Sequence, residues 1–145
     1  MRSCLSLHRV SASLRQQHWL NTVGYGNRTI GSEVDSFWLD NTLKVSADEQ
    51  AEFLKNLLKE QLPFSRRSMD IAENILPSER HGTAVLKYKA GTGHTDHHTA
   101  WLVGYIEKGD EVYVFAFNVD GEKFDETSGL RNDIPREIMK ELGIL

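Results

Sequence analysis

Features that place a protein in a membrane, on nucleic acid or among the disulfide-rich classes are scarce in this sequence. The single cysteine, Cys4, cannot form an internal disulfide, so it carries no information about the redox compartment. No apolar run approaches the roughly 20 residues of a membrane-spanning helix. The net charge is −4 and the longest basic cluster is Arg66-Arg67, whereas a phosphate backbone needs clustered positive charge. We therefore expect no membrane span and no nucleic-acid partner.

Acidic residues are missing from the first 32 positions. Arg2, Arg9 and Arg15 alternate there with serine and leucine, a composition that also suits a mitochondrial transit peptide. Residues 4–10 include serine, histidine and arginine, which makes them too polar for the hydrophobic region of a secretory signal. We expect no signal peptide, and the localisation stays open.

The length and composition indicate one domain or part of one. A chain of 145 residues with 39% hydrophobic and 26% charged residues has an ordinary globular balance. It contains no internal repeat, and its three prolines fall at the ends of predicted elements. We treat residues 1–145 as a single domain in which residues 1–10 match no pattern.

Three helices are predicted in the first half. The first covers residues 11–23 and ends at Gly24. The second begins at a capping box, Ser46 to Glu49, and its apolar stripe stops before Pro63. A shorter one covers residues 66–76. The side chains expected to be buried on these helices are Leu14, Trp19, Leu20, Val23, Phe53, Leu54, Leu57, Leu58, Met69, Ala72 and Ile75.

Three strands follow, at residues 83–89, 100–107 and 111–118, and Lys108-Gly109-Asp110 forms the turn between the last two. The third strand is apolar on both pleat faces, which predicts cover on both sides. A last helix, residues 133–142, has Pro135 in its first turn and would cover the sheet through Ile138, Met139 and Leu142. The fold class is α+β, with helices first, then a three-stranded antiparallel sheet and a closing C-terminal helix.

Several short motifs occur in a fixed order along the chain. They are Tyr25-Gly26-Asn27, the segment 31–39 that holds Phe37-Trp38-Leu39, Lys89-Ala90-Gly91, the strands 101–107 and 112–118, Arg131, and the ending Leu142-Gly143-Ile144-Leu145. In this order and spacing they resemble the C-terminal part of a class D serine β-lactamase, one of the penicillin-recognising enzymes. The resemblance covers residues 11–145 and implies a partial penicillin-recognising domain.

The resemblance implies that Lys89, Ala90, Gly91 and Arg131 bind substrate. Lys89 would supply positive potential at a strand end, Gly91 would let the ligand approach the main chain, and the Arg131 guanidinium would grip a carboxylate. Lys89 and Arg131 should then lie side by side along one cleft. Ala90 stands where the family carries a hydroxyl, a loss of about 1.5–3 kcal/mol unless Thr92 or Thr95 substitutes. Without the family, Lys-x-Gly is also typical of a strand-end turn, and Arg131 of an exposed arginine at a helix start.

Trp38 would have a supporting catalytic role in such an enzyme. Its indole N–H would hold a carbamylated lysine that acts as general base. That lysine belongs to a Ser-x-x-Lys motif, and no serine from Ser3 to Ser128 has a lysine three places on. Trp38 is equally consistent with a packed aromatic in an inward-facing loop.

The resemblance implies binding of β-lactams and, in the complete family, their hydrolysis by a serine nucleophile. Since that serine is missing, we expect a truncated form whose own activity is open. The alternatives are a fragment of a penicillin-sensor domain and a non-functional remnant. Relatives are exported. We expect the sheet face that a missing N-terminal half would cover to be apolar and exposed, which favours self-association.

One group of residues, His94, Asp96, His97 and His98, has metal-ligand chemistry. No cysteine and no further histidine except His81 is placed to complete a tetrahedral site, so a polar loop beside the cleft is the preferred interpretation. We expect neither a metal nor a cofactor.

Overall fold

The computed structural model describes residues 2–31, 35–39, 42–94 and 98–145. Within these ranges the chain forms four helices and one four-stranded antiparallel sheet with the strand order β1-β2-β3-β4. The helices are α1 (Arg2–Val23), α2 (Ala47–Leu58), α3 (Arg66–Asn74) and α4 (Phe124–Glu141). The strands are β1 (Ser78–His81), β2 (Ala84–His94), β3 (His98–Lys108) and β4 (Glu111–Gly121).

The sheet differs from the predicted one in the number of its strands and in their lengths. The prediction of three strands is wrong because β1 was missed: its four polar residues show no apolar alternation, and a turn at Gly82, with φ +58°, folds it back onto β2. In addition, β2 continues beyond Lys89 to His94. Gly91 and Gly93 disfavour a strand, yet they pair in register with Trp101 and Thr99 of β3.

The helices also depart from their predicted bounds. α1 begins at Arg2, well before residue 11. α4 begins at Phe124, so Arg131 and Pro135 lie inside it instead of at its start. Gly129 and Pro135 both disfavour a helix interior, which explains the late predicted start. The first turn is held instead by Thr127, which is buried and donates its hydroxyl to the Lys123 carbonyl at 2.7 Å.

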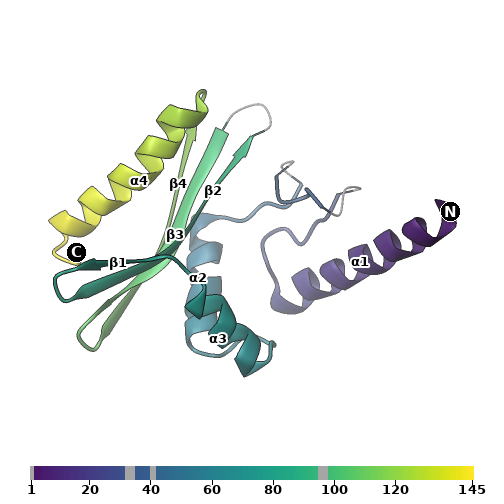
Figure 1. Ribbon diagram of the computed structural model, residues 1–145, viewed down its shortest axis with the longest axis horizontal. Helices are drawn as coiled ribbons and strands as arrows, with labels where there is room; N and C mark the ends of the chain where they lie inside the picture. The colour runs from purple at the N-terminus through teal and green to yellow at the C-terminus, as the bar shows by residue number, and fades with distance from the viewer. Residues whose placement is uncertain (1, 32–34, 40–41, 95–97) are drawn as a thin grey trace.

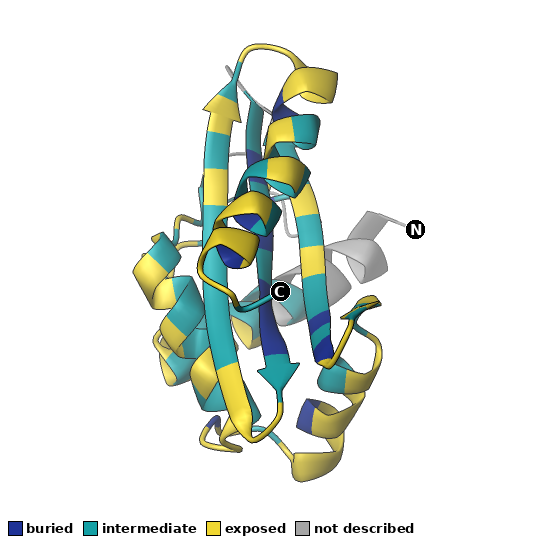
Figure 2. Ribbon diagram, turned by 90° about the vertical axis from the view of Figure 1, so that its left-hand side faces the viewer, coloured by how far each residue is buried: buried dark blue, intermediate teal, exposed yellow. Residues whose placement is uncertain are grey.

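The sheet lies between helices (Figure 1): α4 packs on one face and α2 on the other, with α3 beside α2, while α1 extends away from the sheet. β4 contacts both α2 and α4, which confirms the predicted cover on both faces. The core on the α4 side contains Ala84, Leu86, Ile106 and Met139. In Figure 2, buried residues concentrate in the middle of the sheet and on the inner side of α4.

Exposed apolar side chains do not form the bare sheet face that was expected. In the described ranges they belong mostly to the helices and to the loop at 35–39, and Val112 is the strand residue among the large ones. Helix residues predicted to be buried are among them, since Ile75 and Leu142 are 73% and 67% exposed. The others are Leu14, Trp19 and Ile138. Self-association stays a prediction, now located on the helices.

Candidate functional site

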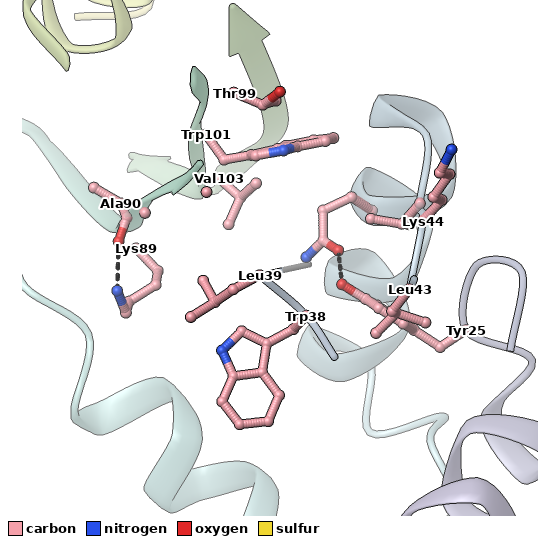
Figure 3. A pocket seen from close by; sticks show the side chains of 14 residues that line it. Tyr25, Trp38, Leu39, Leu43, Lys44, Lys89, Ala90, Thr99, Trp101 and Val103 are labelled. Carbon is pink, nitrogen blue, oxygen red and sulfur yellow. Dashed lines mark hydrogen bonds between the residues drawn. The ribbon is translucent and has the colours of Figure 1, made fainter. Parts of the chain in front are cut away.

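A cavity of about 550 Å³ lies between the face of β2 and β3, the loop that carries Trp38 and the start of α2 (Figure 3). Strands β2 and β3, the turn at Tyr25, residues 38–39 and 43–45, and α2 all line it. The sheet contributes Lys89, Ala90, Gly91, Gly93, Thr99, Trp101 and Val103, and the remainder are Tyr25, Trp38, Leu39, Leu43, Lys44, Val45 and Gln50. The Lys-Ala-Gly and Tyr-Gly-Asn motifs, distant in sequence, therefore meet at one cavity.

Strand alternation decides which side chains face this cavity. Lys89, Gly91 and Gly93 are alternate residues of β2, and their partners on β3 are Val103, Trp101 and Thr99. Directly opposed residues of an antiparallel pair share a face, so these six lie on the α2 side. The intervening residues, Ala90 and Thr92, therefore point to the α4 side. Ala90 borders the cavity, but its methyl group lies across the sheet.

The glycines leave the cavity face of β2 accessible. An added Cβ at Gly91 or Gly93 would meet no other atom within 4 Å. No side chain covers the β2 main chain at these two positions, which is the condition that the predicted role of Gly91 requires.

The edge of β2 is open along the same stretch. β1 pairs with β2 only from Ala84 to Lys87, and the Tyr88 N–H then donates to the Pro77 carbonyl at 3.1 Å. In the described part of the chain no strand pairs with this edge from residue 89 onward. Because backbone groups alternate along a strand, those of Ala90 and Thr92 point to the same edge as Tyr88. The open edge can thus bind an extended amide.

Arg131 reaches this part of β2 from α4. Its Nη1 donates to the Thr92 hydroxyl at 3.0 Å, and the Ser128 hydroxyl lies 3.4 Å from the same oxygen. The Arg131 Nε is buried and has no hydrogen-bond partner among the described residues. The guanidinium is therefore held beside the open edge, part-buried, on the α4 side of the sheet.

Lys89 and Arg131 were expected side by side in one cleft, and this is not what the structure shows. Lys89 lines the cavity and its Nζ donates to the Ala90 carbonyl, whereas Arg131 does not line the cavity. The two cations flank the same stretch of β2 from opposite faces. The expectation overlooked the pleat: at an open edge, groups from both faces of a sheet can reach one ligand.

The Tyr25-Gly26-Asn27 motif fixes the wall opposite the sheet. The Asn27 side chain donates to the Thr42 carbonyl at 2.8 Å and accepts from the Lys44 N–H at 3.1 Å. The Asn27 N–H donates to the Lys44 carbonyl at 2.9 Å. Gly26 has φ +51°, and a Cβ there would lie 2.1 Å from that carbonyl oxygen, so only glycine fits.

Tyr25 connects this turn to α2. Its hydroxyl donates to the Gln50 side-chain carbonyl, and its ring contacts Phe53 edge-on at 5.0 Å between centroids. Burial, with a smaller contribution from the negative charge of Glu49, raises the pKa of Tyr25. The phenol therefore stays protonated at neutral pH and acts as a donor.

The loop before α2 packs inward only in part. Phe37 is buried, but Trp38 and Leu39 are 52% and 44% exposed and line the cavity. The lining residues that sequence patterns did not single out include Leu43, Lys44, Val45, Gln50 and Thr99. Gln50 alone had a signal, because the capping box of Ser46 and Glu49, confirmed in the structure, places it in the first turns of α2.

The group with metal-ligand chemistry, His94 to His98, lies partly outside the described ranges. Asp96 and His97 lie outside the described ranges, and so does the loop tip between β2 and β3. Elsewhere in those ranges no three histidine, cysteine or acidic side chains are grouped to hold a metal ion. No described helix is long and apolar enough to cross a membrane.

Comparison with known proteins gives a consistent match. The model of the penicillin binding protein transpeptidase domain matches residues 6–140. Beta-lactamase OXA-19 of Pseudomonas aeruginosa is 36% identical over 94% of this chain and 53% of its own length. The methicillin resistance mecR1 protein of Staphylococcus aureus is 32% identical over 88% of this chain and 22% of its own length. The class D β-lactamase YbXI from Nostoc has a TM-score of 0.84 at 34% identity, over 99% of this chain and 63% of that chain.

The chain therefore belongs to the penicillin-binding protein transpeptidase domain family. Within that family it corresponds to part of a class D β-lactamase domain. It spans about half the length of the curated β-lactamase that it matches, 53%.

Proposed function

We propose that this chain forms the substrate-recognition wall of a class D β-lactamase-type site. The open edge of β2 binds the amide of a β-lactam, Arg131 binds its carboxylate, and Lys89 adds positive potential from the other face. The nucleophile of the reaction, a serine with a lysine three places on, does not occur in these 145 residues. The chain by itself recognises the ligand and does not hydrolyse it.

One observation carries this proposal: the stretch of β2 that loses its strand partner is the stretch with two open glycines and a cation on each face. A strand edge without a partner leaves its backbone groups to other partners: the Ala90 carbonyl accepts from Lys89 Nζ, and no described strand pairs with the Ala90 and Thr92 N–H groups. A charge-assisted hydrogen bond from a guanidinium to a carboxylate is about twice as strong as a neutral one. Trp101, Val103 and Leu39 give the cavity an apolar wall for the rest of the ligand.

Trp38 takes the supporting role in this proposal. Its exposed indole lines the cavity and lies edge-on to Phe37, with ring centroids 5.0 Å apart. Phe37 is buried and anchors the loop, which holds the neighbouring Trp38 at the cavity. Its N–H can then donate to an anionic general base supplied beside the cavity.

The test is a titration of the ¹⁵N-labelled chain with benzylpenicillin, followed by amide chemical shifts. We expect shifts concentrated in residues 89–94, and Arg131→Gln should weaken binding by about tenfold or more, the effect of losing a hydrogen bond to a charged group. Arg67→Gln, an exposed arginine of α3, is the matched control. Shifts confined to other surfaces, or equal affinities for the two variants, would contradict the proposal.

A penicillin sensor is the second candidate, favoured by the match to the methicillin resistance protein over 88% of this chain. Both candidates need the same recognition wall, and they differ in the fate of the acyl group. The chain should therefore be combined with an N-terminal half of a class D enzyme that carries Ser-x-x-Lys. Turnover of a chromogenic β-lactam supports the enzyme, and a stable acyl adduct without turnover supports the sensor.

A further inference from the structure

The hydroxyl missing at Ala90 has a counterpart two residues further along β2. Thr92 lies on the same face of the strand as Ala90, since side chains of alternate residues share a face. It is the residue to which Arg131 is bound: Nη1 of the guanidinium lies 3.0 Å from the Thr92 oxygen. A hydroxyl and a guanidinium are thus joined at the open edge of β2 without any contribution from Ala90.

The geometry of this contact leaves the Thr92 hydroxyl proton available. Arg131 donates to the oxygen of Thr92, so the Thr92 O–H must point elsewhere. The neighbouring acceptor is the Ser128 hydroxyl at 3.4 Å, a long and therefore weak hydrogen bond. A positively charged donor also polarises the Thr92 O–H and makes it a better donor to an anion. The backbone of Thr92 faces the open edge, so the ligand and this hydroxyl can meet.

We propose that Thr92 is the specificity-determining residue that supplies the hydroxyl for a ligand carboxylate in this chain. The carboxylate is bound jointly by the Thr92 O–H and the Arg131 guanidinium, and Ser128 limits the rotation of the Thr92 hydroxyl. The contact with Thr92 also orients the Arg131 guanidinium. The buried Nε of Arg131 has no hydrogen-bond partner in the described residues that could orient it instead. This inference rests on the proposed function, because it names the group that selects a carboxylate at that site.

The experiment compares benzylpenicillin with its methyl ester, which lacks the carboxylate charge, by NMR titration of the full 145-residue chain. Thr92→Val keeps the shape and removes the hydroxyl. We expect it to weaken benzylpenicillin binding by about tenfold and to reduce the preference over the ester by the same factor, with ester binding unchanged. Thr92→Ser should retain the preference. Thr22→Val, at an exposed position of α1, is the matched control.

Two further results make the outcome decisive. Adding Ala90→Thr to Thr92→Val should restore part of the preference, because it returns a hydroxyl to the same face; a purely structural role of Thr92 would not be rescued this way. If Thr92→Val does not fold, Thr92→Ala alone and with Ala90→Thr replace it. An unchanged preference in the hydroxyl-free variant overturns the inference. If Arg131→Gln still weakens binding in that case, the proposed function stands; if neither substitution matters, both fall.

Discussion

At the residue scale, Gly26 has the strictest requirement in the described structure. It combines a left-handed backbone, φ +51°, with a main-chain contact in which an added Cβ would lie 2.1 Å from the Lys44 carbonyl oxygen. Gly82 shares the left-handed conformation, φ +58°, but has no atom within 4 Å of such a Cβ. Comparing alanine substitutions at Gly26 and Gly82 therefore distinguishes the stability cost of a left-handed backbone from the added cost of a steric contact.

We predict that Gly82→Ala lowers the free energy of unfolding by about 1–2 kcal/mol, the cost of a left-handed residue with a side chain. Gly26→Ala should cost about 1–3 kcal/mol more, because the Lys44 backbone must move as well. Urea unfolding followed by circular dichroism measures both. Equal losses would show that the contact between the Tyr-Gly-Asn turn and Lys44 adds nothing to stability.

At the scale of elements, an ion pair joins β1 to α4. Arg136 contacts both carboxylate oxygens of Glu79, at 2.8 and 3.3 Å, and its guanidinium lies 5.1 Å from the centre of the Tyr88 ring. Hydrogen bonds from Arg136 lower the pKa of Glu79 to about 2. The short strand β1, with few apolar contacts of its own, is thereby fixed to the closing helix.

This ion pair predicts a loss of stability in acid. The ordinary pKa of Glu79 is 4.5 and its folded value is about 2, so the stabilisation is complete above pH 4.5 and disappears as the pH falls through about 2. We expect the free energy of unfolding of the wild type to exceed that of Glu79→Gln by about 1 kcal/mol at pH 7. The difference is modest because the Glu79 side chain is 36% exposed.

Urea unfolding at pH 7, 4 and 2 tests this prediction. The difference between wild type and Glu79→Gln should shrink toward zero at the lowest pH. Glu137→Gln, an exposed glutamate of α4, is the matched control. A difference that stays constant, or that grows in acid, would show that the ion pair does not set the acid stability of β1.

At the scale of the whole molecule, the proposed function separates recognition from chemistry. The described residues bring together an open strand edge, two cations and a cavity wall, while Ser-x-x-Lys is absent from the sequence. Loss of a nucleophile removes covalent catalysis and leaves binding. The separation therefore has a direct consequence for labelling by penicillins.

We predict that the purified chain forms no covalent penicillin adduct. The chain is incubated with a fluorescent penicillin, boiled in detergent and separated by electrophoresis, with a complete class D β-lactamase as the positive control. No labelled band is expected at 16.5 kDa. A band that survives boiling would mean that another side chain of this sequence attacks the β-lactam.

Local signals in the sequence were sufficient where a few neighbouring residues decide the structure. The capping box at Ser46 and Glu49 predicted the start of α2, and Gly109, with φ +62°, forms the turn between β3 and β4 as expected. They failed where distant contacts decide. β1 exists because β2 offers it a ladder and Arg136 binds Glu79, and α4 starts early because Thr127 is buried.

The sequence by itself determined the family motifs, the order of the helices and strands except β1, and the absence of the nucleophilic pair, because each is a matter of residue identity and spacing. Only the tertiary structure decided on which face of β2 each site residue lies. It placed Lys89 on the cavity side of β2 and Thr92 with Arg131 on the α4 side, and it left the edge between them open. Register and strand pairing set these positions, and both depend on contacts between residues far apart in the chain.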